Sequence, residues 1–397
     1  MLAKKYKDML TQKSVIRELS EFATARGKEI GYENVFDYSL GNPSIPVPQE
    51  FTDYVAKLLM EENPIKLHGY SPSLGIPEAK EKLAASLNRR FGMEYCGSHI
   101  FMTSGAAGAI AHAVRCVTEP GDEVLAFAPF FPEYNPYINH SGAVLKTVPP
   151  QVEDFQINFS EFEKMLTEKV AAVLINTPNN PSGVAYSEET LTRLAKLLEE
   201  KSEEYGHIIY LISDEPYREI IFDGIESPYP SKFYKYTLSC YSFSKSLSLP
   251  GERIGYVAVH PECPNAETMV VMMGQISRGI GHNCPASLFQ LAVAEFADKT
   301  ADLSVYETNM NILYDALTEL GFTCVRPNGT FYIFPKALEE NSVAFCKKAL
   351  KYDLILVPAD SFGCPGYFRM AYCIDTEKVE RSVATLKKFV ETEYPNR

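Results

Sequence analysis

The stretch TLSCYSFSK, residues 237–245, decides how this chain is expected to fold. Its first part, Thr237–Ser242, is a short β-branched and apolar run that predicts a buried strand. Lys245 then stands just beyond the carboxyl end of the strand, where open α/β sheets bind their ligands. Most lysines lie on the surface. Here, however, Phe243 and Leu247 would desolvate the amine, lower its pKa from roughly 10.4 and favour its nucleophilic neutral form.

Further short apolar runs on both sides of this stretch predict more buried strands. They are Glu123–Phe127, Ala171–Asn176, Ile208–Ser213 and Ile254–Val259. Between several of them lie amphipathic segments such as Glu188–Tyr205, in which leucines recur on one helical face. Strands that alternate with helices predict an α/β fold with a mostly parallel central sheet flanked by helices.

The character of the chain changes near Pro285. Two helical stretches at 285–296 and 303–320 precede strand-like segments at 330–334, 355–358 and 367–373, and a last helix is expected from Thr376 to about Thr392. This order is typical of a smaller α+β domain. We therefore expect a large α/β domain at 46–285 and a small domain made of 1–45 and 286–397. The first 45 or so residues, which include the amphipathic stretch Val15–Phe22, can join the small domain or cross to a partner chain.

The composition excludes several classes of function. The 38 basic and 51 acidic residues give a net charge of −13, which disfavours binding to nucleic acid or to anionic membranes. The lysines at 4, 5 and 7 lack the apolar run of a secretory signal. Nine cysteines without a CxxC pair are typical of a reducing compartment, so we expect a cytoplasmic protein. No metal site is predicted, because the nearest pattern, His260 to Cys263, has no second half.

Three other strand ends carry residues suited to binding a small molecule. Residues 176–183, NTPNNPSG, and residues 213–217, SDEPY, each follow a predicted strand. Residues 103–109, TSGAAGA, form a small-residue turn that opens a helix, and its free backbone N–H groups suit a phosphate. Taken singly, the three have ordinary interpretations as a turn, a helix cap and a glycine turn.

Together these motifs resemble the aspartate aminotransferase family of fold type I enzymes, which depend on pyridoxal 5′-phosphate (PLP). Lys245 matches the lysine that holds the cofactor covalently, and Asp214 matches the carboxylate on the pyridine nitrogen. The resemblance runs from about residue 40 to 375 and implies that further residues bind the cofactor. They are Asn180 and Tyr217 at the phenolic oxygen, Arg253, Ser242, Ser244, Gly105, Ala106 and Ala107 near the phosphate, and Phe131 stacked on the ring.

The same resemblance implies a substrate site and a homodimer. Arg369 matches the arginine that binds the substrate α-carboxylate, and Gly41 and Asn180 lie near the substrate in the family pattern. Tyr70 matches a tyrosine that reaches the phosphate of the neighbouring subunit, so an active site shared between two copies is expected. Arg278 matches an arginine that reaches across the dimer to a second carboxylate, which favours aspartate or glutamate. Aromatic amino acids and alanine stay open as substrates.

The expected reaction is transfer of an amino group between an L-amino acid and a 2-oxo acid, with Lys245, Asp214 and Tyr217 as catalytic residues. Lys245 would move a proton from the substrate Cα. Within PLP enzymes, the alternative is a carbon–sulfur β-lyase. A non-catalytic PLP-binding sensor and a serine acyl-transfer enzyme with the SxxK motif of residues 242–245 are alternatives of other classes. The serine acyl-transfer alternative lacks the companion motifs that accompany SxxK in such enzymes.

Overall fold

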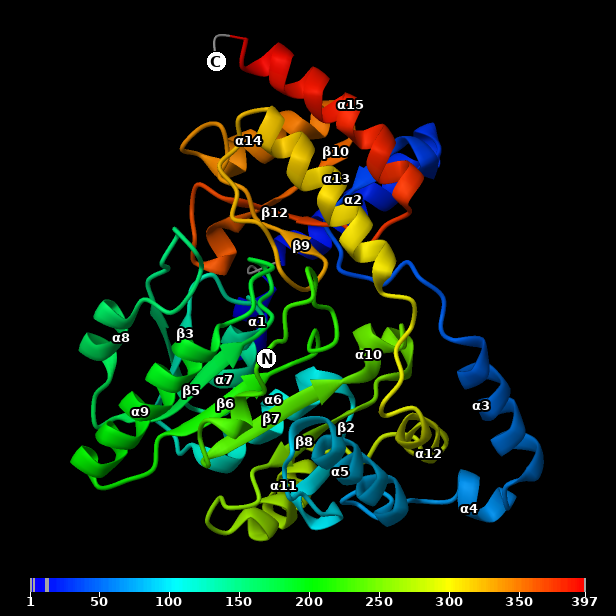
Figure 1. Ribbon diagram of the computed structural model, residues 1–397, viewed down its shortest axis with the longest axis vertical. Helices are drawn as coiled ribbons and strands as arrows, with labels where there is room; N and C mark the ends of the chain where they lie inside the picture. The colour runs from blue at the N-terminus through cyan, green and yellow to red at the C-terminus, as the bar shows by residue number, and fades with distance from the viewer. Residues whose placement is uncertain (1, 3, 11–13, 396–397) are drawn as a thin grey trace.

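The computed structural model describes residue 2, residues 4–10 and residues 14–395. Its centre is a seven-stranded sheet with the order β2-β8-β7-β6-β5-β3-β4 (Figure 1). The strands are β2 (Ile100–Thr103), β3 (Glu123–Phe127), β4 (Val144–Val148), β5 (Val170–Asn176), β6 (Tyr210–Asp214), β7 (Thr237–Ser242) and β8 (Gly255–Val259). The five strands that the sequence predicts in this region are all present, within two residues at each end.

The sheet is parallel from β4 through to β7, and β8 runs antiparallel to both of its neighbours. The carboxyl ends of β2, β5, β6 and β7 therefore meet at one edge, and β8 starts at that same edge. This geometry confirms the predicted α/β fold with a mostly parallel sheet. It also brings the four motifs of the sequence together, since each follows one of these strands.

Helices cover both faces of the sheet (Figure 1). The helices of this part of the chain are α3 (Gln49–Glu61), α4 (Pro64–His68), α5 (Pro77–Phe91), α6 (Gly105–Val117), α7 (Tyr134–Asn139), α8 (Phe159–Met165), α9 (Glu188–Tyr205), α10 (Phe243–Ser246), α11 (Ala266–Ile280) and α12 (Ser287–Glu295). The core on one face joins α6 and α11 to the strands, and the core on the other face joins α8 and α9 to them. Helix α9 spans the predicted residues, because Ser187 caps its first turn and Gly206 ends it in a left-handed conformation.

A second layer of short strands and long helices lies above the carboxyl edge of the sheet (Figure 1). The strands β9 (Tyr332–Ile333), β11 (Val357–Pro358) and β12 (Phe368–Ala371) form one small sheet, and β1 (Phe36–Asp37) pairs with β10 (Leu354–Ile355) in another. The helices are α2 (Val15–Ile30), α13 (Ser304–Glu319), α14 (Ser342–Ala349) and α15 (Thr376–Glu393), and α1 (Lys4–Met9) precedes them. The division into two domains at residues 45 and 285 stays a prediction, although the β1–β10 pair joins the first residues to the last part of the chain.

Two of the predicted strands differ in detail from the structure. The segment expected at 355–358 belongs to two strands, because the chain changes its pairing partner at Leu356, from β1 to β12. The strand expected at 330–334 keeps only Tyr332–Ile333, since Thr330 has a positive φ of 62° and breaks the extended backbone. Within the described ranges, no helix combines the length and the apolar character that crossing a membrane requires.

Candidate active site

A cavity of about 510 Å³ opens at the carboxyl edge of the sheet, between the sheet and the small strands above it. It is lined by most of the residues that the sequence predicts for the site. They are Gly41, Ala106, Ala107, Phe131, Asn180, Asp214, Tyr217, Ser242, Ser244, Lys245, Arg253 and Arg369. Residues far apart in the sequence thus surround one space, and what each does there stays a prediction.

Three predicted site residues do not line this cavity. Gly105 lies directly behind it, where a Cβ atom would come within 2.8 Å of the Arg253 Nη2 atom. Its φ of 77° lies in the left-handed region that favours glycine. Tyr70 lies in the loop before α5 and is fully exposed, and Arg278 lies in the last turn of α11. Both would need a second copy of the chain to reach an active site.

Lys245 is placed by the turn that joins β7 to α10. Ser242 caps this helix by accepting the N–H of Ser244, and the two hydroxyl oxygens lie 2.7 Å apart. The Lys245 amine donates to the carbonyl of Gly41 at 2.7 Å. Burial lowers the pKa of this amine to about 8, and the positive charges of Arg253 and Arg369 add to the effect. About half of the amine is therefore neutral near pH 8.

Asp214, at the end of β6, is buried in the floor of the cavity. Its Oδ2 atom accepts the hydroxyl of Tyr134 at 2.5 Å, whereas Oδ1 has no hydrogen-bond partner among the described residues. Burial raises the pKa of this carboxyl to about 7, and the Tyr134 hydrogen bond opposes that rise. An unpartnered carboxylate oxygen in this position is suited to a buried cation or N–H donor.

Arg369 projects from β12 and is almost completely buried. Its Nη1 atom donates to the side-chain oxygen of Asn180 at 3.0 Å, and Nη2 donates to the carbonyl of Ser39. Its Nε atom has no partner within the described part of the chain. Burial lowers the pKa of the guanidinium, so an anion that enters the cavity would offset an unfavourable desolvation.

Arg253 lies between η4 (Pro250–Glu252) and β8. It adopts a positive φ of 50°, which is uncommon for a side chain other than glycine, and strained backbone of this kind gathers at functional sites. The guanidinium donates to the carbonyl of Pro250 at 3.0 Å. It faces the first turn of α6, whose N–H groups lack helical partners. A guanidinium and a helix N-terminus together form an anion-binding corner.

Two tyrosines and one asparagine belong to this site, although the sequence did not identify them. Tyr134 orients Asp214 together with Asn176, whose amide donates to the Asp214 backbone carbonyl at 2.9 Å. Tyr332 lines the cavity, and its hydroxyl lies 3.1 Å from that of Tyr217 while its ring faces the Arg369 guanidinium at 4.5 Å. The available signals were the aromatic residue three positions after Phe131 and the tyrosine in the strand-like segment 330–334.

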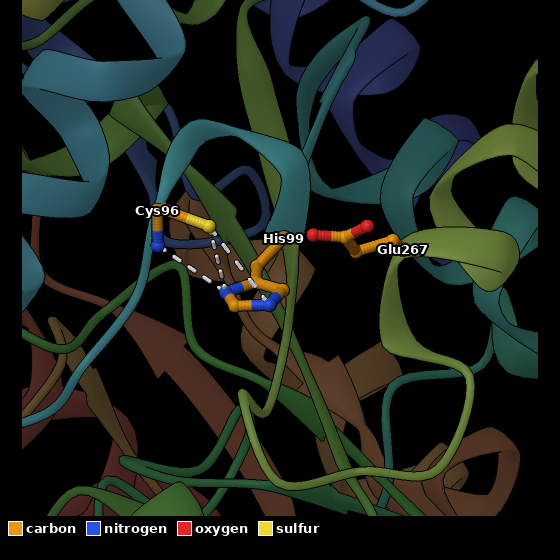
Figure 2. A group of neighbouring side chains, drawn as sticks. All are labelled: Cys96, His99 and Glu267. Atoms are coloured by element: carbon orange, nitrogen blue, oxygen red, sulfur yellow. Dashed lines mark hydrogen bonds between the residues drawn. The ribbon is translucent and has the colours of Figure 1, made fainter.

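A second group of polar side chains, none of which lines the cavity, is drawn in Figure 2. Cys96, His99 and Glu267 bring potential metal-ligating atoms within 4.8 Å of one another, which the sequence did not predict. In the structure, however, the His99 Nδ1 atom accepts the backbone N–H of Cys96, and Glu267 accepts the hydroxyl of Ser98. These contacts join the segment before β2 to the first turn of α11.

Comparison with known proteins agrees with this geometry. A crystal structure of an amino transferase from Eubacterium rectale has a TM-score of 0.96 and 42% sequence identity, and the match covers 99% of this chain and 100% of that one. An aspartate aminotransferase from Thermotoga maritima has a TM-score of 0.88 and 26% identity over 98% of this chain and 100% of that one. Among curated relatives, a probable aspartate/prephenate aminotransferase of Aquifex aeolicus is 30% identical, over 93% of this chain and 94% of the relative.

The family model described as aminotransferase class I and II matches residues 34–386, which include every residue that lines the sheet side of the cavity. The match spans the central sheet and the strands above it, so it is not confined to one motif. With the fold, the cavity and these relatives in agreement, the chain belongs to the class I and II aminotransferases and is a transaminase.

Proposed function

We propose that this transaminase uses PLP bound covalently to Lys245 and moves an amino group between an L-amino acid and a 2-oxo acid. The observation that carries the proposal is that the buried amine of Lys245, the carboxyl of Asp214 and the guanidinium of Arg253 line one cavity. When bound, PLP supplies an electron sink for the substrate's Cα. The cavity offers a separate partner for each part of that molecule.

At the ring end, Asp214 fits the pyridine nitrogen. Its unpartnered Oδ1 atom is free to accept an N–H, and the resulting ion pair would hold the carboxyl ionised despite its burial. Tyr134 and Asn176 fix the orientation of the carboxylate from behind. Phe131 lines the same cavity and supplies an aromatic face for stacking.

At the phosphate end, the donors are Arg253, Ser242, Ser244 and the first N–H groups of α6 at Ala106 and Ala107. The planar guanidinium binds two phosphate oxygens at once, and the helix N-terminus adds a favourable dipole. Asn180 and Tyr217 line the same cavity and would donate to the phenolic oxygen.

The substrate side of the cavity contains the residues for positioning and proton transfer. Arg369 would bind the α-carboxylate through its unpartnered Nε and one terminal nitrogen, which fixes the direction of the Cα–H bond. With PLP and substrate bound, the Lys245 Nζ atom would be the base beside the substrate's Cα, and its lowered pKa would favour the neutral form that accepts a proton. It can then accept the Cα proton and return it to the other side of the same bond system.

The relatives' names support an acidic amino acid as one substrate, since aspartate aminotransferases of Bacillus subtilis and Thermotoga maritima are among them. We also infer a homodimer, in which the exposed Tyr70 reaches the neighbouring phosphate site. A cytoplasmic location is supported by the nine cysteines, all of which are free thiols.

The cofactor assignment is tested by spectroscopy and covalent trapping. Purified protein should be yellow, and its visible absorbance should shift when an amino donor is added. After borohydride reduction, peptide mass analysis should find the pyridoxyl label on Lys245. A label on a different lysine, or no label, would overturn the assignment.

The reaction type is tested with a panel of amino acids in the presence and absence of 2-oxoglutarate. The proposal requires a 2-oxo acid for turnover and a new amino acid as product. If ammonia and pyruvate were released without an acceptor, the protein would be a carbon–sulfur β-lyase that shares the transaminase scaffold.

A further inference from the structure

The N-terminal helix contributes a side of the cavity that lies outside the motifs of the sheet. Ser14, Ile16, Arg17 and Ser20 line the same space as Lys245 and Arg369. Arg17 and Ser20 are three positions apart, so they share one face of α2. Val15 and Leu19, which do not line the cavity, pack against the core around β11. The helix is therefore held in a fixed position with Arg17 directed to the cavity.

Further along α2, polar contacts hold the helix to the strands above the sheet. The Arg26 Nε atom donates to Asp353 at 2.6 Å, immediately before β10, and Ala23 is buried against Ile355. Arg369 comes from β12, which belongs to the same group of strands. Arg17 and Arg369 thus approach the cavity from one side, the side opposite the cofactor-binding edge of the sheet.

Within the part of the chain that the structure describes, Arg17 is the one basic residue in the cavity lining that has no assigned role in the proposed reaction. Lys245, Arg253 and Arg369 are its other lysine and arginine residues, and each has a partner assigned to it. The carboxylates in the lining are Asp214, which faces the cofactor ring, and Glu133, which lies near Tyr137 and Arg253 at the phosphate side. Among the described residues, none forms a hydrogen bond or an ion pair with Arg17.

We infer that Arg17 binds the distal carboxylate of a dicarboxylic substrate, an amino acid or 2-oxo acid with a second carboxyl group; this inference rests on the proposed function. An exposed guanidinium on the substrate side matches a carboxylate bidentately. Ile16 and Leu40, in the same lining, offer apolar contact to the methylene groups between the two carboxylates. The preference for an acidic substrate then depends on residues of a single subunit.

This inference differs from the expectation for Arg278, which would act across a dimer. Arg278 does not line the cavity of its own subunit, whereas Arg17 does. The two arginines can be separated by experiment, because substitution of the residue that binds the distal carboxylate weakens acidic substrates and leaves uncharged ones unaffected.

The experiment compares the PLP-loaded wild-type protein with R17M, R17K and R278M, using L-aspartate, L-glutamate and L-alanine as amino donors. R17M keeps the length of the side chain and removes the charge. It should lower kcat/KM for the two acidic donors about 10- to 100-fold, the loss expected for a charged hydrogen-bonded pair. The kcat/KM for alanine should change less than about 3-fold, within the variation expected for a surface substitution. The kcat/KM of R17K for the acidic donors should lie between the values of the wild type and R17M.

K28M is the matched control, because Lys28 lies on the same helix but does not line the cavity. Its kinetic constants should equal those of the wild type. A readout without turnover is the dissociation constant of succinate, a dicarboxylate that lacks an amine. R17M should weaken succinate binding by a similar factor, with the far-ultraviolet circular dichroism unchanged.

Several outcomes would overturn the inference. If R278M lost activity with the acidic donors while R17M did not, Arg278 would be the residue that binds the distal carboxylate, as the dimer hypothesis predicts. If R17M lost kcat/KM equally for alanine and aspartate, Arg17 would have a structural role. A wild-type protein that transaminates alanine but not aspartate would refute the substrate class and leave the proposed function intact, whereas failure with every donor would refute the proposed function itself.

Discussion

At Lys245, the local environment sets the pH at which the amine reacts. Burial lowers its pKa to about 8, far below that of an exposed lysine. The rate at which cofactor-free protein captures PLP should therefore rise with pH and reach half of its maximum near pH 8, as followed by stopped-flow absorbance. Lys245→Arg should lose covalent capture and lower transamination by at least about 10³-fold. A capture rate that rises only near pH 10 would show that the amine is solvated.

Asp214 makes the cofactor-free protein less stable than it could be. Its folded pKa of about 7 lies above the unfolded value of about 4, so the folded state holds a proton that the unfolded state releases between these values. The contribution to stability is present below about pH 4 and is lost as the pH rises through about 7. At pH 8, the burial of an unpaired carboxylate opposes folding.

Asp214→Asn removes this effect, because an amide cannot ionise. Without PLP, the variant should be more stable than the wild type at pH 8, by on the order of 1–3 kcal/mol, and equal to it near pH 4. Transamination should be lost, since the partner for the ring nitrogen is gone. Thermal unfolding of both cofactor-free proteins from pH 4 to 8 measures the difference in stability. If the two curves of stability against pH ran parallel, the argument from the Asp214 pKa would be wrong.

At the scale of elements, β8 controls the distance between the end of β7 and the first turn of α6. Gly255 pairs with Thr103 of β2 on one side and with Ser242 of β7 on the other. A Cβ atom at this position would lie 2.2 Å from the Tyr241 carbonyl oxygen and 3.1 Å from the Gly105 backbone. These are backbone atoms, so they cannot move aside as a flexible side chain would.

Gly255→Ala should therefore force β7 and the first turn of α6 apart. We expect a loss of about 2–4 kcal/mol of stability, as for other overpacked cores, and weaker PLP binding. Gly251→Ala is the control, because a Cβ atom there meets nothing within 4 Å and no positive φ is required. Its melting temperature should stay within a degree or two of the wild type, since surface substitutions change stability by less than about 0.5 kcal/mol. Equal melting temperatures for both variants would refute the argument.

At the scale of the whole molecule, the proposed homodimer would cover a group of exposed apolar side chains. They belong to α3, α4 and α11, and they are Met60, Ile65, Val271, Met272 and Ile280. The chain has a mass of 44.5 kDa, and light scattering should give about twice this value. Tyr70→Phe should weaken PLP binding about 10-fold by removing one hydrogen bond to phosphate.

A hybrid between two impaired subunits tests whether the site is shared. A dimer of Lys245→Ala with Tyr70→Phe contains one active site that has both native residues, provided that Tyr70 acts in the neighbouring subunit. At limiting PLP, co-expressed subunits should then exceed the summed activity of the two separate variants. Activity equal to that sum would show that Tyr70 serves its own subunit or none.

The sequence predicted the residues that follow strands better than those in loops. Asp214, Asn180 and Lys245 stand at the ends of parallel strands, which must meet at one edge once the sheet is inferred. Tyr134 contacts Asp214 from a short helix, and Arg17 reaches the cavity from the N-terminal helix; no periodicity fixes where such segments pack. Charged pairs are equally hidden, because Glu215 and Arg218 look like surface residues in the sequence but pair in the core at 2.8 Å.

The reversed direction of β8 has a consequence for how this enzyme can vary. Since the strand returns directly beside β7, the Lys245 amine and the Arg253 guanidinium, which we propose bind the cofactor, belong to one uninterrupted segment, residues 242–255. Insertions there would disturb both groups at once, so this segment should tolerate no change in length among working transaminases. The N-terminal helix is tied to a different part of the chain, and exchanging it for another sequence can alter which compounds are accepted while the chemistry is left as it was.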